Sequence, residues 1–484
     1  MTVADAGRMQ GGHLPSHHPQ SLIRLIDRLF VAAGVIYLAL FAYFAARASI
    51  LAPYSDMIDL VNDYFRALDQ DQFIEHLFLP HNHHRIVLFR GLIALDVDLF
   101  RGTGLPLVIT AAMCQAGTAL VLAYEVRRVA RGLVVPLATL AAMLVFLTAN
   151  AGDVSQAVNT AYMRTTFFAV LALAVAASAA DRRGDWRRWA AAMAAAAAAD
   201  LALALALWPI FAFMAWRGKA SWLTTSLVAA VGAVFCIAYM SGQSIGAELQ
   251  QGLDPSGLGK AAAYFLAYLG LPWTRGALLP GQLLGAGLLG ASLFALARYG
   301  LAESTRTQRL ALGMILFSLG GAVLAAVGRS YLSAEISVPV RYAILMTPLH
   351  AGFLLLVAPA IVQAWERWPR YVAYGLIVAL ALLMVQQALV GPVVVRAAEW
   401  ARQTITLYHQ GGRTKEMLHW IHPDLAQAEN GYAEMQRRGV YLQWIGPRAS
   451  TLSVAPNSNV SPRDGQSLSD PPSASVLHER DPQK

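Results

Sequence analysis

The stretch YVAYGLIVALALLMVQQALVGPVVV, residues 371–395, decides the fold class. It contains no charged side chain, and a run of about 20 apolar residues is long enough to cross a lipid bilayer as one helix. Similar uncharged runs recur along the chain, at 29–46, 103–124, 133–151, 165–180, 222–247, 276–297, 310–328 and 342–365. The sequence therefore predicts an all-α fold, that of a polytopic helical membrane protein.

The composition of the whole chain agrees with this prediction. Of 484 residues, 57% are hydrophobic and only 14% are charged, whereas soluble proteins carry about 25% charged residues. Soluble globular, fibrous and disordered classes are thereby excluded. The net charge of +8 comes mainly from basic residues in short loops between apolar runs, as the positive-inside rule expects, so no nucleic-acid partner is predicted. The two cysteines, Cys114 and Cys236, lie inside apolar runs and predict no disulfide framework.

Basic residues also predict the orientation of the chain. Residues 1–21 are rich in Gly, His and Pro and are expected to be a disordered cytoplasmic N-terminus, followed by an uncleaved signal anchor. With this orientation, the first half of the chain has ten arginines on the cytoplasmic side and six on the other side. Residues 51–102 then form a long first extracytoplasmic loop.

The segment 189–216 determines the topology of the second half. Its 28 residues are interrupted only by Asp200, and basic residues flank both ends, which favours a hairpin that turns near Asp200 over a single crossing. A hairpin gives about eleven membrane segments within a membrane domain at 22–395. It also places the rest of the chain outside, as a small extracytoplasmic cap at 396–446 and a disordered Ser- and Pro-rich tail at 447–484.

The first loop concentrates acidic side chains beside the membrane. The spacing in PYSDMIDLVNDYFRALDQ, residues 53–70, predicts an interfacial helix with Asp56, Asp59 and Asp63 on one face. A solvated acidic face is the simple alternative, and it fits Asp56 least because this residue follows the first apolar run most closely. The loop holds eight of the 29 carboxylates of the chain: Asp56, Asp59, Asp63, Asp69, Asp71, Glu75, Asp96 and Asp98.

The same loop carries HNHHR, which comprises His81, Asn82, His83, His84 and Arg85. Three imidazoles so close together are able to bind a metal, deliver a proton or donate hydrogen bonds to a phosphate. Metal sites normally draw their ligands from separated elements, so a contact with a polar substrate is favoured over a metal site. Plain interfacial histidines remain the alternative.

Further polar residues within or beside apolar runs are candidates for function. Arg90, next to the acids of the run after the histidines, is expected to pack against protein or to lie at the interface. Asp153 and Arg164 border a second outer loop. Asp200 is either a functional intramembrane acid or a helix cap at the hairpin turn.

Two arginines bracket a late outer loop in GRSYLSAEISVPVRYAILMTPL, residues 328–349. Arg329 and Arg341 each stand at the end of an apolar run, and Tyr342 follows directly. Guanidinium groups are suited to phosphate, so the pair is predicted to hold a lipid-linked phosphate or pyrophosphate. Snorkelling of the two side chains, or an ion pair with Glu335, is the alternative.

Taken together, these features resemble the GT-C class of integral-membrane glycosyltransferases. The resemblance covers residues 22–395 and includes the uncleaved first helix, an acid early in a long first outer loop, and the membrane topology. The local strings resemble bacterial members with an HN-x-HR motif, here residues 81–85, paired with a late GR…RY element, here Gly328-Arg329 and Arg341-Tyr342.

The resemblance implies an activity and the residues that perform it. A sugar would pass from a polyprenyl-phosphate donor to a lipid or cell-envelope glycan acceptor at the outer face of a bacterial inner membrane. Asp56 would be the catalytic acid that activates the acceptor hydroxyl. No second acid stands next to Asp56 as in Asp-x-Asp or Asp-Glu, so no cofactor is predicted, and a divalent metal is not favoured.

Two other classes of function remain open. A flippase or transporter for lipid-linked saccharides would use the same arginines but would not require an acid-rich first loop. A noncatalytic membrane protein would tolerate neutralisation of every polar residue named above.

Overall fold

The computed structural model describes residues 19–81, 84–182, 184–241, 255–300, 304–329, 339–411 and 421–445. The disorder predicted for residues 1–18 and 447–484 falls outside these ranges, whereas residues 19–21 already belong to the first helix. Within the described ranges every regular element is a helix, either α or 3₁₀ (η): α1 (Pro19–Arg47), α2 (Asp56–Asp69), α3 (Phe73–Phe78), α4 (Val87–Phe100), α5 (Leu105–Val129), α6 (Val134–Val145), η1 (Thr148–Asn150), α7 (Ala151–Ser155), η2 (Ala157–Asn159), α8 (Ala161–Ala179), α9 (Trp186–Ala197), η3 (Ala202–Ala206), α10 (Leu207–Arg217), α11 (Trp222–Met240), α13 (Pro255–Thr274), α14 (Leu278–Tyr299), α15 (Arg306–Arg329), η4 (Val340–Met346), α16 (Thr347–Arg367), α17 (Pro369–His409), α19 (Leu425–Arg438) and α20 (Leu442–Ile445).

The helices confirm the predicted membrane class. In the part of the chain that the structure describes, nine helical spans are long and apolar enough to cross a membrane, and each overlaps one of the nine apolar runs in the sequence. The protein is therefore a multi-pass helical membrane protein. The spans are Ser21–Arg47, Leu105–Val129, Val134–Ser155, Ala157–Ala179, Trp222–Met240, Leu278–Tyr299, Arg306–Arg329, Val340–Arg367 and Pro369–His409.

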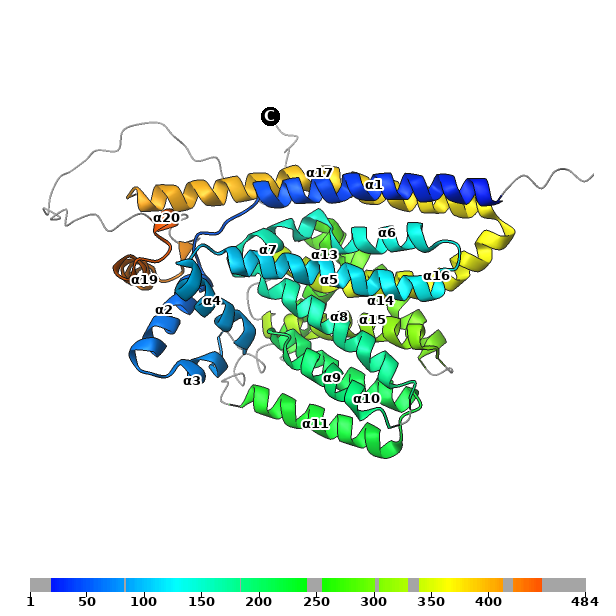
Figure 1. Ribbon diagram of the computed structural model, residues 1–484, viewed down its shortest axis with the longest axis horizontal. Coiled ribbons are helices and arrows are strands. Elements are labelled where there is room, and N and C mark those ends of the chain that lie inside the picture. Colours follow the sequence, from blue (N-terminus) through cyan, green and yellow to red (C-terminus); the bar gives the residue numbers. More distant parts are fainter. Residues whose placement is uncertain are drawn as a thin grey trace, which may run out of the picture.

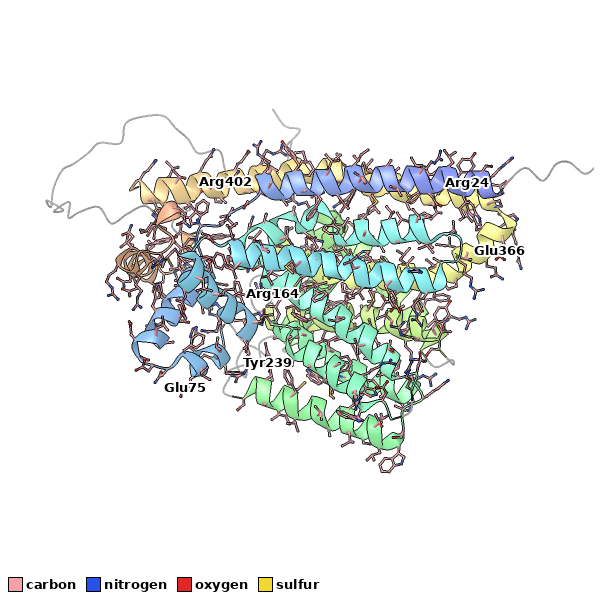
Figure 2. The ribbon with its side chains drawn as sticks, in the orientation of Figure 1. Arg24, Glu75, Arg164, Tyr239, Glu366 and Arg402 are labelled. Carbon is pink, nitrogen blue, oxygen red and sulfur yellow. The ribbon has the colours of Figure 1, made fainter. Side chains whose placement is uncertain are left out.

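The long helices lie roughly parallel and form a bundle, with α1 and α17 side by side along one edge (Figure 1). The first loop and the C-terminal helices α19 and α20 gather beyond one end of this bundle. Figure 2 places Arg24 and Glu366 at the opposite end, and Glu75 and Arg402 at the end that carries the first loop. Charged groups at both ends of apolar helices are the arrangement that a bilayer requires.

The segment after α8 is a helical hairpin, as its basic flanks predict. At one end of α8, the backbone N–H of Lys219 donates to the carbonyl of Ala180 at 2.6 Å. At the other end, Arg164 forms an ion pair with Asp200 at 3.1 Å. Because α8 spans roughly 25 Å between these two contacts, α9 must run along it to the turn at Asp200 and α10 must return.

The C-terminal helices pack on the first loop. The N–H of Ser55 donates to the carbonyl of Ile421 at 2.7 Å, and the hydroxyl of Tyr432 donates to the carbonyl of Pro53 at 2.9 Å. Deeper in the interface, the hydroxyl of Tyr441 donates to Asp96 at 2.9 Å. Residues 421–445 and the first loop, residues 51–102, are thus packed into one folded unit.

Gly431 allows α19 to approach α2 closely. A Cβ atom at position 431 would lie 2.5 Å from the side chains of Ile58 and Asn62, far inside van der Waals contact. We expect Gly431→Ala to loosen α19, raising hydrogen exchange in α2 and α19 about tenfold or more, since overpacking costs about 1–3 kcal/mol. Gly375→Ala is the matched control, because a Cβ atom there meets nothing within 4 Å. Equal protection of α19 in both variants would contradict this account.

Candidate functional site

Asp56 is the first residue of α2, and the backbone before it is tethered to the break between α7 and η2. The N–H of Ile50 donates to Ser155 O at 3.1 Å, and the hydroxyl of Tyr54 donates to Gln156 Oε1 at 3.0 Å. Ser55 has a φ of 51°, which non-glycine residues rarely adopt. The start of α2 is therefore held in a strained conformation that fixes where Asp56 begins the helix.

Asp56 differs from most first-loop carboxylates in having no bonded partner among the described residues. Among the described residues, no hydrogen bond or ion pair joins Asp56 to another group, although it is only partly exposed. The exposed Asp71 and Glu75 aside, the other first-loop acids are each paired with another side chain: Asp59 with His422, Asp63 with Arg66, Asp69 with Arg438, Asp96 with Tyr441 and Asp98 with Tyr64. Asp69 forms its ion pair with Arg438 although its side chain is 59% exposed.

Asp56 lies within electrostatic range of two of the residues that the sequence singles out. Its charge acts on Arg341, the second residue of η4, and on His81. Burial lowers the pKa of the His81 imidazole, and the negative charge of Asp56 opposes this effect. Burial likewise raises the pKa of the Tyr54 hydroxyl, and the positive charge of Arg341 opposes it. The acid, the histidine and the late arginine thus come from distant parts of the sequence to one region.

Both late arginines lie against one aromatic ring. The guanidinium carbon of Arg329 is 5.1 Å from the ring centre of Tyr342, and that of Arg341 is 5.8 Å from it. Such distances are typical of cation–π contacts. The Tyr342 ring also packs at 5.3 Å from Tyr162 and at 5.7 Å from Tyr268, whose ring is 6.3 Å from that of Tyr264. We call these six residues the arginine–tyrosine cluster: Tyr162, Tyr264, Tyr268, Arg329, Arg341 and Tyr342.

Asp153 links the cluster to Asp56. It is only 3% exposed, the charge of Arg341 acts on it, and it acts in turn on Tyr54. Its Oδ2 atom has no hydrogen-bond partner among the described residues. The sequence marks Asp153 only as an acid between two apolar runs, and nothing in that pattern indicates that it joins a site with Arg341.

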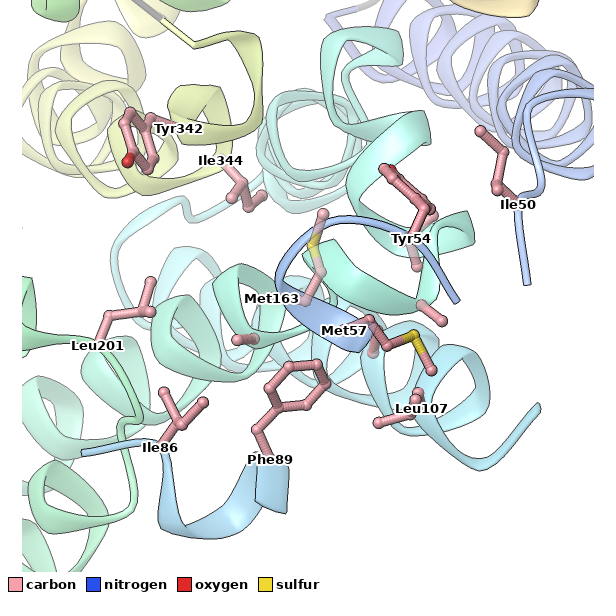
Figure 3. Packing of buried hydrophobic residues seen from close by; sticks show 14 of the residues in the cluster. Ile50, Tyr54, Met57, Ile86, Phe89, Leu107, Met163, Leu201, Tyr342 and Ile344 are labelled. Atoms are coloured by element: carbon pink, nitrogen blue, oxygen red, sulfur yellow. The ribbon is translucent and has the colours of Figure 1, made fainter. Parts of the chain in front are cut away.

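Apolar side chains pack between the elements that carry Asp56 and Arg341. Met57, Met163 and Ile344 come from α2, α8 and η4, are at most 1% exposed and belong to one hydrophobic core. Figure 3 shows Met163 and Ile344 lying between Tyr54 and Tyr342 in that view. The elements that carry the acid and the arginines are therefore packed together as a single unit.

The rest of the HNHHR motif points elsewhere. Nδ1 of His84 accepts a hydrogen bond from the N–H of Ala202 at 3.1 Å. The Arg85 guanidinium donates to the carbonyls of Tyr239 at 2.8 Å and of Phe78 at 2.6 Å. These side chains tie the loop to η3 and to the end of α11, near the Tyr239 labelled in Figure 2. Asn82 and His83 lie outside the described residues.

Arg164 and Asp200 form a fully buried ion pair under the first loop. Arg164 is 0% exposed, and its guanidinium carbon lies 4.8 Å from the ring centre of Phe89. Asp200 also accepts a hydrogen bond from the N–H of Leu88 at 3.1 Å. The hairpin turn and the start of α4 are thus fastened to α8 by one pair of opposite charges.

Arg90 is likewise held by hydrogen bonds within the loop, although its Nε atom has no partner among the described residues. It is 1% exposed and donates from Nη1 to Nδ1 of His76 at 2.8 Å, with Asp63 at 3.9 Å. Because a guanidinium only donates hydrogen bonds, the accepting imidazole nitrogen must be unprotonated. Burial and the charge of Arg90 lower the pKa of His76 to about 4.

This shift predicts a pH-dependent stability of the first loop. Between about pH 6.5 and about pH 4 the unfolded chain holds a proton on His76 that the folded chain lacks, so the free energy of unfolding falls as the pH falls. The loss should reach roughly 1–3 kcal/mol. Thermal unfolding of the wild type and of His76→Gln, which still accepts from Arg90, checks this: the variant should show the shallower pH dependence. Unfolding temperatures that fall equally with pH in the two proteins would contradict this prediction.

Within the described ranges, no group of three or more His, Cys, Asp or Glu side chains is arranged to hold a metal ion. The comparisons with known proteins gave no match to a family model, to a curated protein or to a solved structure.

Proposed function

We propose that this chain is a GT-C-like glycosyltransferase with about eleven membrane segments. It would move a sugar from a polyprenyl-phosphate donor to a lipid or glycan acceptor at the outer face of a bacterial inner membrane, with its N-terminus in the cytoplasm. The observation that carries the proposal is that Asp56, a carboxylate without a bonded partner among the described residues, lies within electrostatic range of Arg341 of the arginine–tyrosine cluster.

The two parts of the region suit the two halves of such a reaction. Asp56 takes the proton from the acceptor hydroxyl, and the freed oxygen attacks the anomeric carbon of the sugar. The bond between that carbon and the phosphate oxygen breaks, and its electron pair remains on the phosphate. Arg329 and Arg341 stabilise the negative charge that develops there.

The surrounding residues keep these groups ready to react. Asp153 lies within reach of the charge of Arg341, and no hydrogen-bonded ion pair joins the two among the described residues. His81 lies within electrostatic range of Asp56 and is suited to contact the acceptor. Tyr342 fixes both guanidinium groups against its ring, which limits their rotation before substrate binds.

The first test of the proposal removes the base. Asp56→Asn keeps the shape of the side chain and loses its basicity, so transfer by protein reconstituted in nanodiscs should fall about 10²- to 10⁴-fold. Donor binding should persist. Asp71→Asn is the control, because Asp71 is exposed and asparagine accepts its φ of 55°. Full turnover by Asp56→Asn would exclude Asp56 as the base, and a wild type that moves lipid-linked sugar without transferring it would favour a transporter.

The second test concerns the arginines. Arg329→Lys and Arg341→Lys keep the charge but lose the planar pair of donors, so the affinity for the polyprenyl-phosphate sugar should fall about tenfold, and more in the alanine variants. Equilibrium binding to the purified variants measures this. Arg370→Lys is the control. Arg370 is exposed at the start of α17, so this variant should bind like the wild type. Unchanged affinity in the lysine and alanine variants of both Arg329 and Arg341 would indicate that these side chains only snorkel to the membrane interface.

A further inference from the structure

Two tyrosines of α13 bury hydroxyl groups that bond to nothing in the described chain. The hydroxyls of Tyr264 and Tyr268 each have no hydrogen-bond partner there, and Tyr268 is 0% exposed. Buried polar groups in proteins are nearly always hydrogen-bonded, because an unpaired hydroxyl costs about 1–3 kcal/mol. Two such groups on successive turns of one helix indicate a partner that the described residues do not provide.

The two tyrosine hydroxyls belong to rings that pack in the same cluster as the two arginines. The charge of Arg329 acts on both tyrosines, and that of Arg341 acts on Tyr264. Nε of Arg341 is itself buried without a partner among the described residues. Phenols and guanidinium groups both donate hydrogen bonds, and guanidinium groups accept none. A single group with several acceptor oxygens and a negative charge would satisfy all of these donors together.

Phosphate is the group that meets this description, and the neighbouring surface indicates that it is attached to an apolar chain. Val323 and Leu324, one to two turns before Arg329 on α15, are 49% and 41% exposed. Exposed aliphatic side chains on a membrane helix face lipid. A phosphate bound at Arg329 would therefore have hydrocarbon within reach on the same helix.

We infer that the hydroxyls of Tyr264 and Tyr268 complete, with Arg329 and Arg341, a binding site for the phosphate of a lipid phosphate. The place of this lipid in a reaction rests on the proposed function, whereas its binding does not. The sequence pattern singles out neither tyrosine, because both lie in the stretch between the apolar runs 222–247 and 276–297.

Removing the hydroxyls should weaken binding of the lipid phosphate without lowering the stability of the unliganded protein. In Tyr264→Phe and Tyr268→Phe the rings and their packing remain, and only an unpaired buried group is lost. The thermal unfolding temperature without ligand should stay the same or rise. Affinity for polyprenyl monophosphate should fall about tenfold in each variant, since a hydrogen bond to a charged group is lost.

Binding of a fluorescent polyprenyl monophosphate to protein in nanodiscs measures this, with Tyr374→Phe as the control because Tyr374 is 65% exposed on α17. Unlabelled polyprenyl monophosphate should compete, whereas uncharged polyprenol and inorganic phosphate should compete far less. Wild-type affinity in both α13 variants would overturn the inference. So would a lowered unfolding temperature, which would indicate that the hydroxyls serve the fold, and so would inorganic phosphate competing as well as the lipid.

The same measurements separate this inference from the proposed function. If the wild type binds polyprenyl monophosphate through Tyr264 and Tyr268 but transfers no sugar, the binding site stands and the glycosyltransferase proposal fails. If Asp56→Asn abolishes transfer while both phenylalanine variants bind and turn over like the wild type, the glycosyltransferase proposal stands and the inferred role of the two tyrosines fails.

Discussion

The ion pair between Arg164 and Asp200 is the interaction on which the arrangement of the first loop depends. Neither group is accessible to water, and a charge left alone at such a depth would cost several kcal/mol, so each requires the other. The pair joins α8 to the hairpin turn, and Asp200 also accepts the N–H of Leu88 at the start of α4. The loop is thus anchored to the membrane bundle by a bond that solvent and salt hardly weaken. Substituting one partner alone would leave the other as an uncompensated buried charge.

Within this frame, the polar groups divide into those that the chain satisfies and those that it leaves open. Asp59, Asp69 and Asp96 are bound by the C-terminal helices, and Arg85 is bound by backbone carbonyls. Such groups hold elements together. Asp56, Asp153 and the tyrosines of α13 lack bonded partners among the described residues although they are partly or wholly buried. Other buried polar atoms of the described chain also lack a partner. These four residues, however, lie in one region with Arg329 and Arg341, which is the arrangement expected where a charged or polar ligand binds.

The sequence predicts the fold well because the membrane imposes a simple rule. Long apolar runs must become helices, so all nine runs reappear as spans, and basic flanks identify the hairpin at Asp200. The position of Asp56 at the start of a loop helix also follows from spacing. What the sequence does not indicate is which charges pair across the chain. The partner of Asp59 is His422, 363 residues away, and His84 and Arg85 bond to elements that no local pattern connects with them. Tyr264 and Tyr268 gain significance only from their neighbours in space.

The strained backbone at Ser55 connects the two ends of the chain with the candidate site. A φ of 51° costs a serine about 1–3 kcal/mol, and it persists only where surrounding contacts enforce it. Here Ile421 accepts from the N–H of Ser55, and Tyr432 donates to Pro53, so the C-terminal helices hold both sides of Tyr54. None of these contacts uses the Asp56 carboxylate. The scaffold therefore fixes the position of the acid while leaving its oxygens available, which is the requirement for a preorganised catalytic base.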